Sequence, residues 1–467
     1  MTELPNDIEC LKVLILQLSA QNEQLLAEID QLKAENAELR RRLGMDSTNS
    51  HQPPSSDGFK KKTTAPGLPK EDKKPNGGQT GHRGKTLKRV EHPDLITVHL
   101  PQNCACCGRQ FSADEAHDIL QSRQVFDLPQ PRLEITEHRL ARIECCGQAQ
   151  EGTYPPAVTA AVQYGPGVRA WIVKLSVDHK MPMEQISQLF QDLYDYDLNS
   201  ATVDDALARG YVLAAPVEAQ VMAQLTEADR VHFDETGVRV AGQLRWMHVA
   251  STETLTHLFV HDKRGGEALH SEASVLKDFT GTAVHDCWGP YFSFTQVHHV
   301  LCGAHLLREL KGLWDNGVVW AEAMHGFLLD LYKMPRPVVD FAPYRLQYHQ
   351  ILEKADQEEP PPKRSRRGKP KQSKGRNLLD RLRKHEDGVL AFACEPDIPF
   401  TNNQAERDVR PTKVKQKVSG CFRTKAGAQA YARLQGAIST FRKQGLNVFA
   451  TLRDLFSHVP VVLACGE

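Results

Sequence analysis

Three short acidic stretches contain the residues best suited to chemistry. Asp234 lies in His-Phe-Asp-Glu-Thr-Gly, Asp286 in His-Asp-Cys-Trp-Gly-Pro-Tyr, and Glu406 in Asn-Asn-Gln-Ala-Glu-Arg. The first two acids stand where short β-strands are expected to end, and the third begins a helix rich in Arg and Lys. Carboxylates gathered from such places can hold two Mg²⁺ or Mn²⁺ ions about 4 Å apart, the arrangement that cuts and rejoins phosphodiester bonds. The sequence therefore predicts Asp234, Asp286 and Glu406 as catalytic metal ligands.

Neighbouring acids compete for these roles, because a single Asp at a strand end is more often a cap or turn residue than a ligand. Glu235 is expected to point to the opposite face of its strand, since side chains alternate. Asp408 is two positions from Glu406, so it is expected on a different face of the helix. Asp262 and Asp397 are the remaining competitors. The occurrence of all three acidic stretches in one chain favours Asp234, Asp286 and Glu406 as the ligands.

Basic residues follow Glu406 on the same predicted helix. Arginine binds phosphate through two parallel hydrogen bonds, so this face could hold DNA, although a solvated charged face would also explain the lysines. From Ser47 to about Asp94 the chain is rich in Pro, Gly, Ser, Lys and His, which predicts a flexible basic arm or a solubilising linker. The predicted DNA-binding residues are Arg407, Arg410, Lys413, Lys415, Lys417, Arg83 and Lys85.

Four clustered cysteines are candidate zinc ligands. Cys104 and Cys107 have the Cys-x-x-Cys spacing followed by Gly that is typical of a zinc knuckle, whereas Cys145 and Cys146 are adjacent and suit a metal less well. The alternative is a former zinc ribbon that is now held by packing alone. The chain has 11 cysteines, an odd number, so thiol or metal chemistry is expected in place of a disulfide framework.

A heptad repeat runs through residues 8 to 43. Ile with Leu at the two core positions favours a parallel two-stranded coiled coil, and Asn at the first position fixes its register. The alternative is an amphipathic helix packed on its own domain. The predicted dimerisation residues are Leu11, Leu18, Leu25, Leu32 and Leu39, with Asn22 and Asn36.

The catalytic acids are expected in a ribonuclease H-like α/β core. Strands are predicted at 230–240, 244–251 and 254–261, then a helix at 267–279, strands at 282–286 and 298–302, and a helix from near His305. Further helices are predicted at 314–356, 378–394, 403–417 and 426–458. Upstream, 132–143 is strand-like. Helices at 183–193 and 200–211, with Ser200 as N-cap, form a helix-turn-helix or, because Asp204 and Asp205 would repel phosphate, a structural module.

The fold class predicted is therefore multidomain α+β. The expected divisions are a leucine zipper at 1–45, a flexible basic linker at 46–94, a zinc-finger-like domain at 95–155, and a helical module at 156–225. A ribonuclease H-like catalytic domain follows at 226–425, with a helical insertion at about 314–395, and a C-terminal helical element ends the chain at 426–467.

Composition limits the compartment and the partners. The formal net charge of the 467 residues is +0, yet basic residues are concentrated in patches that would favour nucleic acid. No apolar stretch reaches the roughly 18 to 20 residues that a membrane span needs, and the N-terminus lacks the pattern of a secretory signal. We expect a protein of the bacterial cytosol or nucleoid with no membrane partner.

The three acidic blocks also resemble those of transposases of the insertion sequence 66 family, members of the Asp-Asp-Glu superfamily. The resemblance extends over nearly the whole chain and includes the leucine-zipper start, the Gly-Gly-Gln-Thr-Gly-His block at 77–82, the cysteine pairs, and Cys-Gly-Ala-His at 302–305. It implies that Asp234, Asp286 and Glu406 are the catalytic acids and that Arg407 and Arg410 are the basic positions beside them. It also suggests small accessory transposition proteins.

The function predicted is a Mg²⁺-dependent DNA transposase that acts as a homo-oligomer on the inverted ends of its own element and on target DNA. One alternative is a ribonuclease H-like nuclease or resolvase that cuts without joining. Another is a non-catalytic zipper and zinc-finger regulator that binds DNA without regard to Mg²⁺.

Overall fold

The computed structural model describes residues 7–43, 49, 87–112, 114, 116–156, 158–362 and 372–464, and its centre is a five-stranded mixed sheet. β4 is antiparallel to both β3 and β5, whereas β6 is parallel to both β3 and β7. The predicted combination of helices with a sheet of mixed strand directions is confirmed. The strands lie in the spatial order β5 (Thr256–His261), β4 (Gln243–Ser251), β3 (Arg230–Val240), β6 (Thr282–His285) and β7 (His298–Leu301).

The central strand β3 is long because apolar and β-branched residues recur along it. Val231, Phe233, Val238 and Val240 are buried. Its hairpin to β4 turns through Ala241–Gly242, which both have positive φ, 49° and 77°. Such a two-residue turn matches the right-handed twist of the strands it joins.

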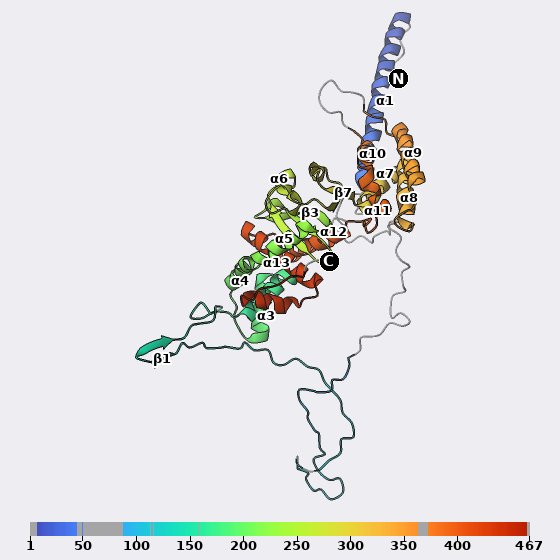
Figure 1. Cartoon of the computed structure of the whole chain (residues 1–467). Helices are drawn as coiled ribbons and strands as arrows, with labels where there is room; N and C mark the ends of the chain where they lie inside the picture. The colour runs from blue at the N-terminus through green and yellow to red at the C-terminus, as the bar shows by residue number, and fades with distance from the viewer. Residues whose placement is uncertain are drawn as a thin grey trace.

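The strands β3, β4 and β5 pack against the helices α5 (Ala215–Glu227), α12 (Asn403–Ser419) and α13 (Lys425–Lys443) (Figure 1). Their buried side chains and those of β3, β4 and β5 form one continuous apolar core. α13 approaches β5 closely at Gly436, where an added Cβ would lie 3.0 Å from the carbonyl oxygen of Thr256. The sheet and the helix that carries Glu406 are therefore parts of one packed unit.

A second core holds the helices that follow β7. These helices are α7 (Gly303–Trp314), α8 (Val319–Lys333), α9 (Ala342–Glu358), α10 (Lys374–Lys384) and α11 (Glu386–Cys394). Trp320, Tyr348 and Leu379 are buried in it beside Val300 and Leu301 of β7. Residues 363–371, between α9 and α10, lie outside the described residues.

A third, smaller core lies among α2 (Pro166–Val173), the π-helical turn Lys174–Asp178, α3 (Met183–Tyr194) and α4 (Ser200–Leu213). The C-terminal helix α14 (Val448–Phe456) packs on α2. The prediction that Ser200 caps α4 is wrong, because Asn199 is the cap. The Asn199 side chain accepts a hydrogen bond of 2.8 Å from the backbone N–H of Ala201.

Two further predictions of regular structure are wrong. The stretch 267–279 is not one helix but α6 (Gly266–Leu269) and a 3₁₀ turn, Val275–Lys277. Between them, the Ser271 hydroxyl donates to the carbonyl of Ala268 at 2.7 Å, which competes with helix continuation. The strand expected at 132–143 is confined to β1 (Arg142–Cys145), which pairs with β2 (Gln148–Glu151).

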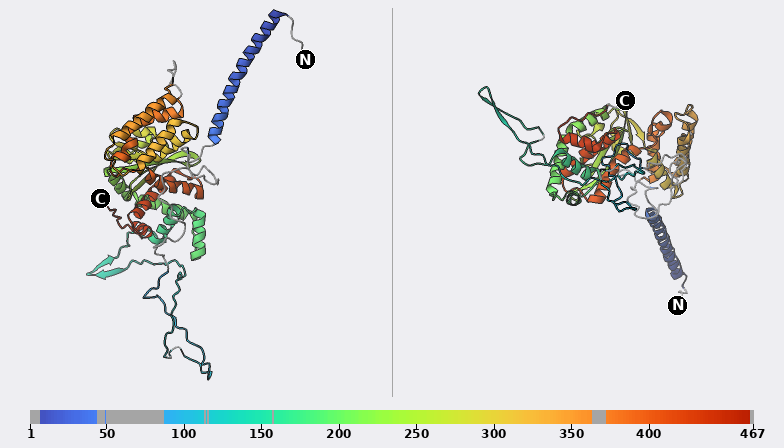
Figure 2. Two further views of the ribbon diagram at one scale, coloured as in Figure 1. Left: turned by 90° about the vertical axis from the view of Figure 1, so that its right-hand side faces the viewer. Right: turned by 90° about the horizontal axis from the view of Figure 1, so that it is seen from below.

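The N-terminal part of the chain stands apart from these cores. The described residues from Pro166 onward are called the body below, and those between 87 and 165 are called the arm. Helix α1 (Ile8–Leu43) extends away from the body, and the arm carries the β1–β2 hairpin outward (Figures 1 and 2). The large apolar side chains of α1 whose burial is described are exposed, with Leu18 and Leu25 both at 56%. The alternative in which α1 packs on its own domain is therefore wrong. None of the helices described has the length and apolar content needed to cross a membrane.

Candidate active site

The register of the sheet aligns the first two acids. β3 and β6 run parallel, and His232 of β3 is paired with Val284 of β6. Asp286 lies two residues beyond Val284, immediately after β6 ends, as predicted. Asp234 lies two residues beyond His232 inside β3, so the prediction that it stands at the end of a short strand is wrong, because β3 continues to Val240. Residues two apart share a face of the sheet. The two carboxylates are therefore delivered to neighbouring places by the backbone alone.

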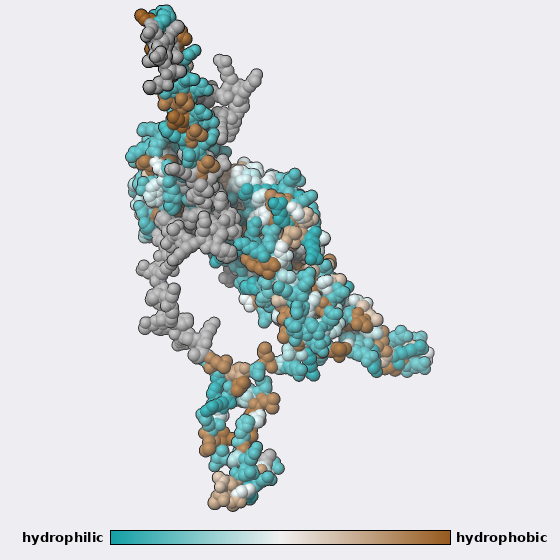
Figure 3. Space-filling model, turned by 180° about the vertical axis from the view of Figure 1, so that it is seen from behind, coloured by the Kyte–Doolittle hydropathy of each residue, from teal (hydrophilic) through white to brown (hydrophobic). Residues whose placement is uncertain are grey.

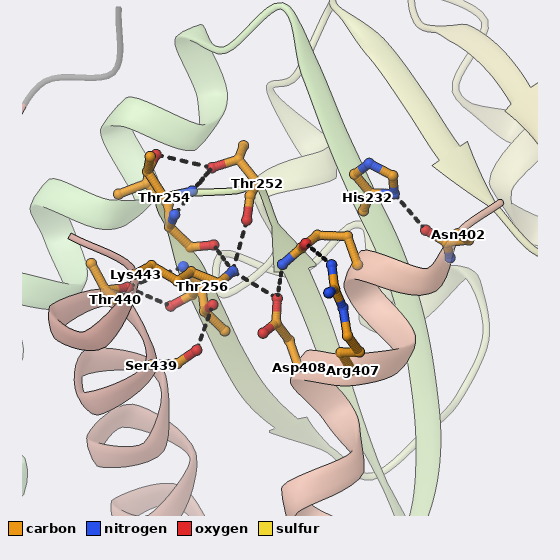
Figure 4. Close-up of polar contacts among 12 residues, drawn as sticks. His232, Thr252, Thr254, Thr256, Asn402, Arg407, Asp408, Ser439, Thr440 and Lys443 are labelled. Carbon is orange, nitrogen blue, oxygen red and sulfur yellow. Dashed lines mark hydrogen bonds and ion pairs between the residues drawn. The ribbon is translucent and has the colours of Figure 1, made fainter. Parts of the chain in front are cut away.

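The third acid is positioned by a buried amide at the start of α12. Asn402, fully buried, donates from Nδ2 to the carbonyl oxygen of Phe233 at 2.7 Å, and its Oδ1 lies 2.9 Å from Nδ1 of His232 (Figure 4). Because the amide oxygen must accept, His232 donates from Nδ1. Phe233 precedes Asp234, so this bond docks the first turn of α12, which contains Glu406, beside the first acid.

Electrostatic interactions connect the three acids. Burial raises the pKa of Asp234 well above its usual value, and the charges of Glu235, Asp286 and Glu406 raise it further. Burial also raises the pKa of Glu406, and Asp286 adds to that effect, while Arg308 and Arg410 oppose it. Carboxylates that destabilise one another's charge in this way gain most from a bound cation.

The donor set suits hard divalent cations. The three side chains offer only carboxylate oxygens, the ligands that Mg²⁺ prefers, and Glu406 Oε1 is buried with no hydrogen bond from the described part of the chain. The acids do not form a group in which one oxygen of each lies within 4.8 Å of the other two. Such spacing does not argue against a two-ion site, because Asp286 and Glu406 would then complete different ions.

Glu235 has partners of its own and is not a spare ligand. Its side chain is completely enclosed; Oε1 accepts hydrogen bonds from Nε and Nη2 of Arg264 at 2.8 and 2.6 Å, and Oε2 accepts one from the Tyr291 hydroxyl at 2.7 Å. Burial, with a contribution from Asp286, raises the pKa of Glu235 to about 7. Glu235 therefore ties β3 to the segments after β5 and β6.

Arg264 is the central residue of this network, and no motif in the sequence points to it. Its guanidinium lies over the rings of Trp246 and Trp288, 4.9 and 4.2 Å from their centroids. Nη2 is also 4.0 Å from Oδ2 of Asp286. Arg264 thus places a fixed positive charge between Glu235 and Asp286. Tyr291 could have been found from the sequence, because it ends the motif that contains Asp286.

The other competing acids are engaged elsewhere. Asp262 forms ion pairs with Arg245 at 3.1 Å and Lys425 at 3.2 Å. Asp408 pairs with Lys443 at 2.7 Å, which joins α12 to α13 (Figure 4). These contacts give both carboxylates structural partners.

The basic residues of α12 divide into two groups. Arg407, Arg410 and Lys417 are exposed, and Arg407 donates to the Gln404 side chain at 2.7 Å. Lys413 and Lys415 are half-buried and donate to backbone carbonyls of Gly237 and Ser176, and burial lowers the pKa of Lys415 to about 8. Arg83 and Lys85 lie outside the described residues.

The cysteines of the arm lie at two separate turns. Cys104 accepts a backbone hydrogen bond from Gly108 at 2.9 Å, so the first pair sits in a tight loop. The sulfur atoms of Cys145 and Cys146 are 3.6 Å apart at the end of the β1–β2 hairpin. The structure does not gather three or more of these described thiols within 4.8 Å of one another. The zinc assignment stays a prediction.

Comparisons with known proteins cover most of the chain. Residues 161–430 match the family described as Transposase IS66 family, and residues 3–88 match a family of unknown function, DUF6444. Over 77 residues the chain is 35% identical to "Uncharacterized protein y4jO" of Sinorhizobium fredii (strain NBRC 101917 / NGR234), which covers 16% of this chain and 24% of that protein. The match thus spans about a quarter of that relative. All three predicted catalytic acids fall within the first matched region.

Proposed function

The chain belongs to the IS66 transposase family, and from that premise we propose that it is a Mg²⁺-dependent DNA transposase that cuts and joins strands at the ends of an insertion sequence. The family implies an enzyme that binds and cleaves nucleic acid. The single observation that supports the catalytic assignment is the convergence of the three carboxylates, in which burial and the charge of Asp286 raise the pKa of both Asp234 and Glu406.

These three side chains would hold the divalent ions, Mg²⁺ or Mn²⁺. When bound, two such ions activate the attacking oxygen of a phosphodiester exchange and neutralise the leaving oxygen. The protein's own contribution is orientation: the β3–β6 register fixes Asp234 and Asp286, and Asn402 fixes the first turn of α12. Glu235 and Arg264 hold the segments around those acids in one arrangement.

DNA would approach along the exposed basic face of α12. Arg407 and Arg410 stand one and four residues after Glu406 and are exposed, so they can contact the phosphates that flank the scissile bond. Lys417 extends the same face. Lys413 and Lys415 would contribute positive potential more than direct contacts, because their ammonium groups bind backbone oxygens. The basic linker with Arg83 and Lys85 remains a second proposed DNA contact.

The proposal extends to the catalytic domain, the oligomeric state, the arm and the partner proteins. The strand order β5-β4-β3-β6-β7 supports a ribonuclease H-like catalytic core, interrupted by the helices α8 to α11. The exposed heptad leucines of α1 support a homo-oligomer joined through a coiled coil. The arm would carry a zinc-binding function through Cys104, Cys107, Cys145 and Cys146. Accessory transposition proteins remain a suggestion of the family alone.

The test is a cleavage and joining assay on DNA that carries the element's ends. Asp234→Asn, Asp286→Asn and Glu406→Gln should each abolish cleavage and joining while DNA binding persists. Asp278→Asn, an exposed acid between β5 and β6, is the matched control and should behave as the wild type. Retained joining in any of the three variants would overturn the assignment. Cleavage without joining, when free 3′-hydroxyl ends are supplied, would identify a nuclease or resolvase instead.

A further inference from the structure

A cysteine, a histidine and a carboxylate meet beside the catalytic acids. Cys302 Sγ, a ring nitrogen of His305 and a carboxylate oxygen of Glu406 all lie within 4.8 Å of one another, and Nδ1 of His305 is 3.6 Å from Oε1 of Glu406. In the part of the chain that the structure describes, no other three His, Cys, Asp or Glu side chains meet so closely. The cluster differs from the proposed Mg²⁺ site because two of its donors are sulfur and nitrogen.

The backbone builds this cluster from two distant segments. Cys302 ends the connection from β7 and precedes α7, His305 is in the first turn of α7, and Glu406 is in the first turn of α12. The N–H of Asn402 donates to Cys302 Sγ at 3.1 Å, so the residue that anchors α12 also contacts the thiol. Gly303 donates to the carbonyl of Phe400 at 2.8 Å.

The close approach depends on Gly303. A Cβ added there would lie 2.3 Å from the Phe400 ring, so any other residue would push the two segments apart. The missing side chain lets the start of α7 lie against the start of α12. The convergence of the three donors is therefore a property of the fold and not of flexible surface side chains.

We propose that Cys302, His305 and Glu406 form a binding site for a transition-metal ion of the Zn²⁺ type, and that an ion bound there inhibits DNA cleavage by withdrawing Glu406 from the Mg²⁺ site. The inhibitory part rests on the proposed function, because it needs Glu406 to be a catalytic ligand. The binding part does not. An ion that holds the Glu406 carboxylate toward Cys302 and His305 would turn it away from the Mg²⁺ site, so the two occupancies would compete.

The donor chemistry selects the class of metal. Thiolate, imidazole and carboxylate are zinc ligands, whereas Mg²⁺ takes oxygen ligands. Donors about 2.0–2.3 Å from a tetrahedral Zn²⁺ lie roughly 3.5 Å apart, close to the 3.6 Å between His305 and Glu406. Three protein ligands leave the fourth position open to water.

Binding must displace a proton and a cation. Burial raises the pKa of the Cys302 thiol to about 11, while the Asn402 N–H favours the thiolate, so the thiol would release its proton to solvent as the metal binds. Arg308 Nη2 lies 3.5 Å from Glu406 Oε1 and would have to move aside.

The first test is Co²⁺ titration of the metal-free full-length protein, because cobalt bound to thiolate gives a charge-transfer absorption band. Cysteines of the arm can add to that band, so the measurement is the difference between wild type and variants. Cys302→Ser and His305→Asn should each lose the same part of the band. Cys394→Ser, another free and partly buried thiol, should retain it. Melting temperatures of all variants in the absence of metal check that they fold.

The second test is Zn²⁺ inhibition of Mg²⁺-supported cleavage. Cys302→Ser should require at least about tenfold more Zn²⁺ for half-inhibition, because it has lost a direct ligand. An equal band in Cys302→Ser and wild type, or equal inhibition of both enzymes, would overturn the proposal. If the cobalt difference appears but no form of the protein cleaves DNA, the metal site stands and the proposed transposase activity fails.

Discussion

The body and the N-terminal regions of this chain differ in how much of their apolar surface the chain itself covers. From Pro166 onward the helices and strands bury their apolar side chains in three cores. In α1 and the arm, residues such as Leu25, Leu120 and Ile135 are exposed, and apolar patches are visible on these regions in Figure 3. A single chain thus covers the apolar residues around the three acids, whereas the leucines of α1 stay exposed unless another surface covers them.

The largest expected effect tests the need for a partner. Replacing Leu18, Leu25 and Leu32 together by Ala should convert an oligomer into monomers, because each buried leucine stabilises a coiled coil by about 2–5 kcal/mol relative to Ala. Sedimentation velocity measures the change. Gln17, Gln24 and Gln31, each one residue before a heptad leucine, give a matched triple Ala control that should stay associated. An unchanged association state in the leucine variant would place the contact between chains elsewhere.

The second prediction tests whether the body alone positions Glu406. Asn402→Ala leaves the Phe233 carbonyl and the His232 N–H without their buried partner, at a cost of about 1–3 kcal/mol each. Urea unfolding should therefore show a free energy of unfolding lower by about 2–4 kcal/mol, and DNA cleavage should fall. Asn403→Ala, its exposed neighbour, is the control. Full stability in Asn402→Ala would contradict this account of how α12 is docked.

The sequence predicted the parts of the site that depend on local pattern. Alternating and β-branched residues located β3 to β7 to within a few residues. Asp286 directly follows its strand as predicted, whereas Asp234, expected at a strand end, lies inside β3. The helical segments after β7 were also located. These features follow from short-range periodicity, which a sequence contains explicitly.

The rest depends on contacts between distant residues. Arg264 follows β5 with no motif of its own, and it matters only because the fold places it between Glu235 and Asp286. Asn402 was visible in a motif, yet its bond to Phe233 spans 169 positions. The stretch 267–279 misled the prediction because its composition suits a helix while a serine side chain competes for the backbone.

The third prediction concerns the pH dependence of the stability of the body, to which Glu235 contributes. The folded-state pKa of Glu235, about 7, is above the ordinary value of 4.5, so the folded protein keeps a proton that the unfolded chain has lost. This contribution to stability is complete below about pH 4.5 and is lost as the pH rises to about 7, a change of about 3 kcal/mol. Urea unfolding in a metal chelator measures it. Glu235→Gln should remove this part of the pH dependence, and an unchanged profile would contradict the assignment.

The smallest expected effect concerns the surface of the body that is proposed to contact DNA. Arg410→Gln removes one exposed positive charge of α12, so DNA affinity should weaken by about 1 kcal/mol and the slope of log affinity against log salt should decrease by about one. Titration of labelled DNA at several salt concentrations measures both. Lys333→Gln, an exposed lysine at the end of α8, is the control and should change neither. If both variants bind DNA as the wild type does, the DNA contacts lie on the N-terminal regions, and the body serves catalysis alone.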